Sequence, residues 1–406
     1  MPVRPLRIAI VGCGTAGPAA AVLLRRQGHE VVLFERAPEC KAVGAGFLLQ
    51  PSGMAVLEEL GIMEGVLAHA AKVDCLHVID ADGDTLLDLK YGELGQGSFG
   101  AGLHRPVLLQ HLIAAMETAG VEIRWGCEIE TVSKSKTGWT LKSTDGGEST
   151  GFDLLIVADG ARSKLRDLAG TRGVDRGYAW GAHWFIGRNN GVFPENELYQ
   201  VVDGTRRLGG FLATGRDLDG DEPLVSLFWS IRIEDDAAWR ARPLEEWKDE
   251  ISALCPKSAG LLDQITGWDQ ILTARYGDVR MRRWHGDGVV VLGDAAHAMS
   301  PQLGQGVNLA LADASCLADC VARYPLAEAL AKYQRRRWLA LRYYALATRW
   351  LTPWFQSDHE WLTPLRKIFF LVARNIRPAR YLMTLSMAGL IGSKRPVKTT
   401  RSGKPV

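Results

Sequence analysis

The chain has 406 residues, of which 47% are hydrophobic and 23% are charged. This composition excludes a wholly disordered protein, and the length allows a nucleotide-binding domain with a second domain interleaved or appended. There is no signal peptide and no apolar run of about 18 residues, so we expect no spanning helix. Seven cysteines without a CxxC pair indicate reduced thiols in a cytoplasmic protein.

The charge is distributed unevenly along the chain. Residues 361–406 contain ten Lys or Arg and no Asp or Glu, whereas residues 1–360 carry 38 basic and 46 acidic side chains. We expect no nucleic-acid partner. Cys316 and Cys320 lie four apart on a predicted helix without a second ligand pair nearby, so we interpret them as buried small residues and expect no metal site.

The hydrophobic pattern predicts an α/β protein. A strand at 6–11, a helix at 15–27 and a strand at 31–34 form the first unit, and a helix at 51–60 and a hairpin of 75–79 with 85–89 follow. Next come a helix at 106–119 and strands at 121–125, 128–133, 139–143 and 152–158. Residues 178–229 alternate and are rich in aromatics, which indicates an antiparallel sheet. A strand at 289–292, a helix at 308–320 and proline-broken helices to about residue 390 complete the pattern.

The first unit contains a dinucleotide-binding fingerprint. Gly12-Cys13-Gly14-Thr15-Ala16-Gly17 matches GxGxxG between a strand and a helix, where the glycines allow a tight turn, close approach to a pyrophosphate and close helix packing. Glu35 ends the next strand, where its carboxylate can accept ribose hydroxyls and would repel a 2′-phosphate. This pattern alone leaves FAD and NAD open. The predicted contacts are Gly12, Gly14, Thr15, Ala16, Gly17, Glu35 and Arg36.

Two later segments favour flavin. Residues 154–166, which contain Asp159-Gly160, resemble the DG motif of class A flavoprotein monooxygenases. Residues 293–297 (GDAAH), continuing to Pro301 and Asn308, resemble the GD motif of the same family, which includes para-hydroxybenzoate, salicylate and ubiquinone-ring hydroxylases. With the fingerprint, the resemblance covers residues 6–320.

The resemblance implies the cofactor, its contacts and the reaction. FAD is reduced by NADH or NADPH and reacts with O2 to a C4a-hydroperoxide, which hydroxylates an aromatic or heteroaromatic small molecule. The Pro301 loop lies beside the flavin, and the helix that follows offers N–H groups to the reduced ring. His297 belongs to the structural part of the GD motif. The remaining predicted cofactor contacts are Gly46 in the Gly44-Ala45-Gly46 loop, Arg105, Asp159, Asp294, Pro301, Gly304, Gly306, Val307 and Asn308.

The same resemblance organises the chain into a Rossmann-type FAD-binding domain, an interleaved antiparallel-sheet substrate domain and carboxy-terminal helices. We expect FAD binding by residues 1–175 and 275–330, with 74–104 contributing to the substrate side. Residues 176–274 form the substrate sheet, 331–391 the helices and 392–406 a basic tail. Substrate candidates are the aromatics His183, Trp184, Phe185, Tyr199, Phe211, Phe228 and Trp229. Of these we select His183, Phe211 and Trp229, with His183 able to assist deprotonation of a phenol.

Two alternatives stay open at this point: a related flavin enzyme that transfers hydride without oxygen, and a flavin-binding protein without turnover. Because only one GxGxxG is present, we expect a transient nicotinamide complex rather than a second Rossmann pocket. The chain is expected to be a monomer or homodimer. Its basic carboxy-terminal region, interleaved with apolar residues, leaves two interpretations open: helices that cap the acidic body with a solvated basic tail, or peripheral contact with the inner face of a membrane.

Overall fold

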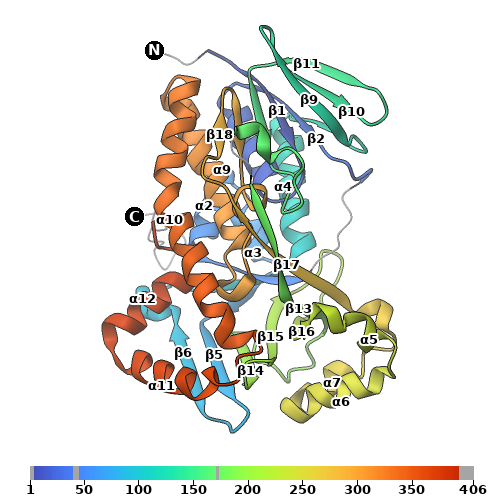
Figure 1. Ribbon diagram of the computed structural model, residues 1–406, viewed down its shortest axis with the longest axis vertical. Helices are drawn as coiled ribbons and strands as arrows, with labels where there is room; N and C mark the ends of the chain where they lie inside the picture. Colours follow the sequence, from blue (N-terminus) through green and yellow to red (C-terminus); the bar gives the residue numbers. More distant parts are fainter. Residues whose placement is uncertain (1–3, 40–44, 171–172, 393–406) are drawn as a thin grey trace.

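The computed structural model describes residues 4–39, 45–170 and 173–392 (Figure 1). A mainly parallel six-stranded sheet forms the core of the upper half of the view, and only its edge strand β18 is antiparallel. Its central strands are buried apolar runs, as expected for a parallel sheet covered on both faces. In sheet order the strands are β18 (His285–Gly286), β19 (Val289–Val291), β12 (Leu154–Val157), β1 (Arg7–Val11), β2 (Glu30–Phe34) and β8 (Glu122–Arg124).

Among the described residues, six helices pack around this sheet, and four of them lie where the hydrophobic pattern predicts helices. The helix after Arg105 has proline in its first turn and ends at Gly120 with φ +70°, the left-handed conformation typical of a glycine cap. The packed helices are α1 (Ala16–Arg26), α2 (Pro51–Leu60), α3 (Met63–Leu67), α4 (Arg105–Ala119), α8 (Asp294–His297) and α9 (Gly306–Arg323). Of these, α1, α2, α4 and α9 are the predicted helices, whereas the short α3 and α8 were not predicted.

A small meander lies beside the parallel sheet. It consists of β9 (Ile129–Ser135), β10 (Gly138–Ser143) and β11 (Glu148–Phe152). The sequence analysis predicted a single strand over 152–158, and this is wrong because the chain changes sheets there. Asp153 marks the break: its carboxylate accepts the backbone N–H of Arg7 at 2.9 Å, and β12 begins at the next residue.

The lower half of the molecule contains a seven-stranded sheet in which all neighbours are antiparallel except β14 and β5. The predicted hairpin joins this sheet, so residues from the first quarter of the chain lie beside residues near 200. In sheet order the strands are β17 (Leu272–Arg280), β13 (Val174–Arg188), β16 (Leu224–Arg232), β15 (Arg207–Gly215), β14 (Glu197–Asp203), β5 (Cys75–Asp80) and β6 (Thr85–Lys90).

One face of this sheet is covered by helices that the sequence analysis did not predict. They are α5 (Asp236–Arg240), α6 (Leu244–Leu254) and α7 (Ala259–Leu262). Trp247 and Ile251 of α6 are fully buried in the cluster that also contains Phe211 and Trp229 of the sheet. The two faces of the sheet therefore differ: one belongs to a core, and the other faces the rest of the molecule.

A third sheet connects the two halves. Strands β3 (Gly46–Leu49) and β4 (Ala71–Val73) flank β7 (Gly100–His104), and β7 lies directly against β15. A Cβ atom on Gly102 would lie 1.8 Å from the backbone oxygen of Ala213, so only glycine permits this approach. The contact places β3, which leads out of the predicted flavin loop, on the face of the seven-stranded sheet opposite α6.

The chain continues through three helices, α10 (Leu326–Phe355), α11 (Leu362–Asn375) and α12 (Arg377–Met387), which run down one side and beneath the molecule (Figure 1). Of the expected proline breaks, Pro378 lies in the first turn of α12, but Pro353 lies inside α10, two residues before its end. Among the described residues, no helix combines the length and hydropathy needed to cross a membrane.

Candidate flavin site

The fingerprint loop connects β1 to α1 and requires glycine at two positions. Gly12 has φ +108°, and a Cβ there would lie 2.4 Å from the backbone oxygen of Ala158. A Cβ on Gly17 would lie 2.0 Å from the backbone oxygen of Gly12, so α1 can pack against this turn only without a side chain. Gly14 is exposed, Thr15 is the N-cap residue of α1 and Ala16 begins the helix. The loop thus presents open backbone and a helix N-terminus, the arrangement that binds a pyrophosphate.

Glu35 lies beside this loop, immediately after β2. Its carboxylate accepts the backbone N–H of Cys13 at 2.7 Å and that of Ala37 at 2.9 Å. These two bonds fix the side chain, and a carboxylate retains acceptor capacity for a ribose hydroxyl. The next residue, Arg36, is exposed.

Asp159 follows β12 at the same edge of the sheet. Its Oδ1 is buried and has no partner among the described residues, and burial raises the pKa of the carboxyl despite a hydrogen bond to Ser163. Ser163 also accepts the backbone N–H groups of Leu165 and Arg166 at 3.2 and 3.1 Å, which caps the following turn. An unsatisfied buried carboxylate oxygen at this edge is suited to a ligand hydroxyl.

Arg105 and Asp294 carry opposite charges and lie near each other. Both side chains are exposed, although Arg105 begins α4 and Asp294 begins α8, deep in the fold. Desolvation by the surrounding protein lowers the pKa of Arg105, and the nearby Asp294 opposes this shift. A cation suited to phosphate and an acceptor suited to hydroxyls are therefore both accessible here. Arg105 also lies over the ring of Phe47, with Cζ 5.7 Å from the ring centroid.

A buried ionic network holds the turn that carries Asp294. His297 lies 2.5 Å from the carboxylate of Asp313 on α9, which also accepts the backbone N–H of Gly293 at 3.1 Å. Arg337 on α10 donates to the other oxygen at 2.7 Å. Burial opposes ionisation of Asp313, but His297 and Arg337 outweigh it and lower its pKa. His297 is therefore a structural residue, as expected, and sequence reasoning missed its partners Asp313 and Arg337.

The Pro301 loop closes the site. Pro301 opens a short 3-10 helix (Pro301–Leu303), Gly304 has φ +61°, and Gly304 and Gly306 are exposed at the start of α9. Val307, in the first turn, is buried. At residues 304–307 the exposed groups therefore belong to the backbone of two glycines, and the side chain of Val307 is buried. Exposed backbone of this kind fits the predicted contact with the flat flavin ring.

Two predicted cofactor contacts have structural roles that the sequence does not reveal. The side chain of Asn308 accepts the N–H of Gln50 at 2.8 Å and donates to the carbonyl of Leu48 at 3.3 Å, so it ties α9 to β3. A Cβ on Gly46 would lie 2.3 Å from Cγ2 of Thr214, so this glycine permits contact between β3 and β15. Gly44, in the same predicted loop, lies outside the described residues.

The substrate prediction needs correction. His183, Phe211 and Trp229 all lie on the face of the seven-stranded sheet that α5–α7 cover. His183 is fully buried, lies 3.0 Å from the carboxylate of Asp236 and contacts the ring of Trp247 edge-on. Burial lowers the pKa of His183, with Asp236 opposing the shift. Phe211 and Trp229 belong to the same core, so none of the three faces the flavin loops.

The opposite face, which we call the flavin-side face, carries Trp184, Gln200, Leu212, Ser226 and Phe228. Strand alternation places these residues away from α6, and Trp184 and Phe228 meet edge-to-face at 5.1 Å. A Cβ on Gly46 would come within 2.7 Å of Cβ of Ser226, so this face meets the strand that follows the flavin loop. Sequence reasoning included Trp184 and Phe228 among its wider candidates but not Gln200, Leu212 or Ser226.

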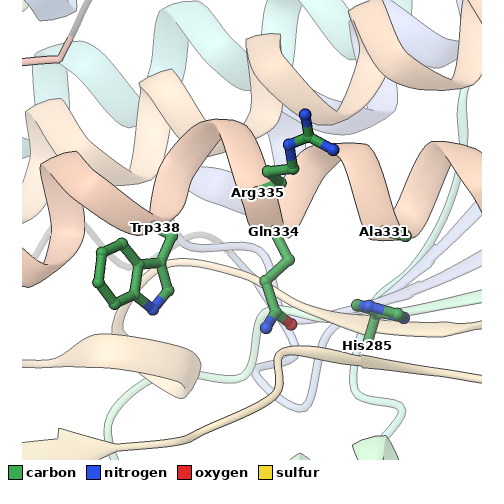
Figure 2. A pocket seen from close by; sticks show the side chains of 5 residues that line it. All are labelled: His285, Ala331, Gln334, Arg335 and Trp338. Atoms are coloured by element: carbon green, nitrogen blue, oxygen red, sulfur yellow. The ribbon is translucent and has the colours of Figure 1, made fainter.

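A separate depression of about 310 Å³ lies on the outside of the molecule. Its lining residues come from β18 and α10, and Figure 2 shows Gln334 projecting from α10 between Trp338 on one side and His285 on the other. Gln334 accepts the N–H of Trp284 at 2.9 Å and donates to the carbonyl of Arg282 at 3.2 Å, so it has a structural role. None of the predicted site residues lines this depression. Within the described chain, no cluster of His, Cys, Asp and Glu suits a metal.

Comparisons with known proteins identify the family of this chain. A family model described as an FAD binding domain matches residues 6–339. The chain is 30% identical over 352 residues to the 3-amino-4-hydroxybenzoate 2-monooxygenase of Streptomyces cremeus, covering 82% of this chain and 84% of that protein. It is 31% identical over 342 residues to a probable 2-heptyl-3-hydroxy-4(1H)-quinolone synthase of Rhodococcus erythropolis, covering 80% and 82%.

Solved structures share the fold. P. aeruginosa PqsL in complex with 2-aminobenzoylacetate matches with a TM-score of 0.79 at 24% identity, covering 91% of this chain and all of that one. Klebsiella pneumoniae HpxO complexed with FAD and uric acid matches with a TM-score of 0.79 at 20% identity, covering 94% and 97%. The fingerprint loop, the open carboxylates and Arg105 fit FAD. The chain belongs to the FAD-binding family of class A flavoprotein monooxygenases and is an FAD-dependent oxidoreductase of the aromatic-hydroxylase type.

Proposed function

We propose that this monooxygenase hydroxylates a neutral, lipophilic aromatic or heteroaromatic ring held between the flavin and the flavin-side face. NADH or NADPH supplies the electrons, and O2 supplies the oxygen atom. In this proposal residues 1–175 and 275–330 hold FAD, and residues 176–274 together with the 74–104 segment hold the substrate. Bound FAD would supply the redox chemistry, while the protein orients the ring and excludes water.

The character of the flavin-side face carries the proposal. Its central side chains are the apolar and uncharged residues Trp184, Gln200, Leu212, Ser226 and Phe228. Aromatic side chains suit a planar ring, and Gln200 can bond a carbonyl or hydroxyl group. A carboxylate buried against these five side chains would find no cationic partner among them, which is costly. A quinolone-like ring, as in the name of the Rhodococcus relative, fits better than a benzoate, as in the name of the Streptomyces relative.

Glu35, Arg105, Asp159 and Asp294 would hold FAD in this arrangement. Glu35 is placed for a ribose hydroxyl, Arg105 for phosphate and Asp294 for a hydroxyl of the flavin side chain. The exposed glycines of residues 304–306 would border the ring. The reduced nicotinamide would bind transiently, because the chain contains a single GxGxxG.

Mass spectrometry of products formed under labelled dioxygen tests the proposal. Purified holoenzyme is incubated with NADH or NADPH and matched pairs of quinolones, N-heteroaromatics and hydroxybenzoates. We expect one labelled oxygen atom in a neutral heteroaromatic product, with lower KM than for the carboxylate-bearing partner. Product that forms without oxygen would instead identify a hydride-transferring reductase. No turnover across the panel, with FAD bound, would favour a flavin-binding protein without activity.

A further inference from the structure

The carboxy-terminal helices leave an apolar stripe on the outside of the molecule. Helix α11 buries one face, including Phe370 and the guanidinium of Arg366, which donates to the carbonyls of Gly204 and Trp354. Its other face is apolar as well. Along this outer face Trp361, Leu365, Ile368, Val372 and Ile376 recur at helical spacing and are 65, 46, 60, 52 and 48% exposed.

The stripe extends onto α12 and is large for the surface of a water-soluble protein. Tyr381 and Leu382 of α12 are 40 and 49% exposed, and Phe369 and Leu371 of α11 add to the outer surface. Contiguous exposed apolar surface of this kind marks an interaction site, because single exposed apolar residues are normal but long stripes are not. Figure 1 shows α11 and α12 together at the lower edge of the molecule.

The charged residues within the carboxy-terminal segment itself are of one sign, although Asp82 from another segment lies 2.7 Å from Lys367. Residues 361–406 contain ten cations and no acid, and Arg377 is exposed between Ile376 and Tyr381. Some of these cations have acidic partners elsewhere: Lys367 lies 2.6 Å from Asp80, and Arg380 lies 2.9 Å from Glu93. Five more follow in residues 393–406. Apolar residues interleaved with cations, with Trp and Tyr among them, form the pattern that binds anionic lipid surfaces.

Two other occupants fit less well. Residues 393–406 contain only Val397 and Val406 as large apolar side chains, too few to cover the stripe. A second copy of the chain would place the same basic surface opposite itself in a two-fold contact, with no acid from residues 361–406 to offset the repulsion. We propose that the outer face of α11 and α12 binds the surface of an anionic membrane leaflet, with the apolar stripe in the headgroup region and the cations at the phosphates.

The inner side of the same helices adjoins the flavin-side face. Met387 of α12 belongs to one apolar cluster with Leu48 and Leu212, and Gln305 beside the flavin loop donates to the carbonyl of Met387 at 2.7 Å. Membrane binding at α11 and α12 therefore places a lipid surface next to the wall of the proposed substrate site. The surface proposal itself does not depend on the identity of the substrate.

Vesicle co-sedimentation of the full-length holoenzyme tests the inference. The vesicles contain phosphatidylcholine alone or with about 30% phosphatidylglycerol, at about 50 and 500 mM salt. We expect binding to the anionic vesicles that falls several-fold at high salt. Binding should be about tenfold weaker for the double variant Ile368→Ser, Val372→Ser.

A matched control separates the stripe from general apolar exposure. The double variant Val174→Ser, Val192→Ser removes two side chains that are 48 and 43% exposed on another part of the surface, and should bind vesicles within about twofold of wild type. Thermal melting and FAD content confirm that each variant is folded. The inference is overturned if wild type does not bind anionic vesicles at low salt, or if both double variants lose binding equally. It is also overturned if gel filtration shows a dimer that the stripe variant alone dissociates while no vesicles are bound.

Discussion

The two large sheets present their functional surfaces in different ways. In the parallel sheet the neighbouring strands β19, β12, β1 and β2 end at one edge, and Asp294, Asp159, Gly12 and Glu35 follow those ends. In the seven-stranded sheet the proposed substrate residues lie on a face, midway along strands that run in alternating directions. A parallel strand points its carboxyl end at the ligand. An antiparallel sheet has two chemically similar faces, and only the elements packed on it distinguish them.

The tight flavin turn gives the largest expected effect of any substitution. Gly17→Ala places a Cβ 2.0 Å from the backbone oxygen of Gly12, and the turn must move to relieve this contact. We expect FAD affinity to fall at least about a thousandfold, roughly 4 kcal/mol. Gly220→Ala, at a glycine with nothing within 4 Å of a built Cβ, is the matched control and should retain wild-type FAD content. Equal FAD content in both purified variants would contradict the assignment of this edge.

The ionic network behind the GD turn comes next. Asp313→Asn leaves Arg337 buried without a charged partner, and we expect a loss of about 3 kcal/mol in the free energy of unfolding. Because the folded pKa of Asp313 is lowered, its contribution is present above the ordinary carboxyl pKa of about 4 and is lost as pH falls through the folded value. The difference in the free energy of unfolding between Asp313→Asn and wild type should therefore shrink only in strong acid. Asp319, also on α9, pairs with the more exposed cations Arg323 and Arg336. Asp319→Asn should therefore lower the free energy of unfolding by less than about 1 kcal/mol.

Substitution of His183 tests whether this residue acts as a catalytic base or belongs to the core. We expect His183→Gln to lower stability by about 2 kcal/mol, since it disturbs a buried hydrogen bond with Asp236. The pKa of His183 is lowered, so wild type keeps this contribution above about pH 6.5 and loses it as pH falls below that value, where the unfolded chain is protonated. The pH profile of kcat should not change. Loss of the acid-side limb of that profile, with unchanged melting temperature, would restore the role of a catalytic base.

The same contrast explains what the sequence could and could not reveal. In the parallel sheet, a glycine or an acidic residue follows the end of each of four predicted strands. The residues at that edge of the sheet could therefore be predicted one by one from the sequence. The correct face of the other sheet depended on α6, whose buried Trp247 and Ile251 recur four apart in a stretch that the sequence analysis left without helices. Without that helix, alternation leaves His183 and Trp184 equivalent. Asn308 shows a different limit, since the partners of its amide, Leu48 and Gln50, lie about 260 residues away in sequence.

Two phenylalanines on opposite faces of neighbouring strands give the most direct test of the account. Phe228 lies on the flavin-side face, and Phe211 stacks on Phe193 in the covered core at 4.3 Å. Steady-state NAD(P)H oxidation with the identified substrate should show KM about tenfold higher for Phe228→Ala, roughly 1.4 kcal/mol, with FAD content retained. Phe211→Ala should instead lower stability by about 3 kcal/mol with KM unchanged in the folded enzyme. A raised KM for Phe211→Ala alongside a wild-type KM for Phe228→Ala would contradict the placement of substrate on the flavin-side face.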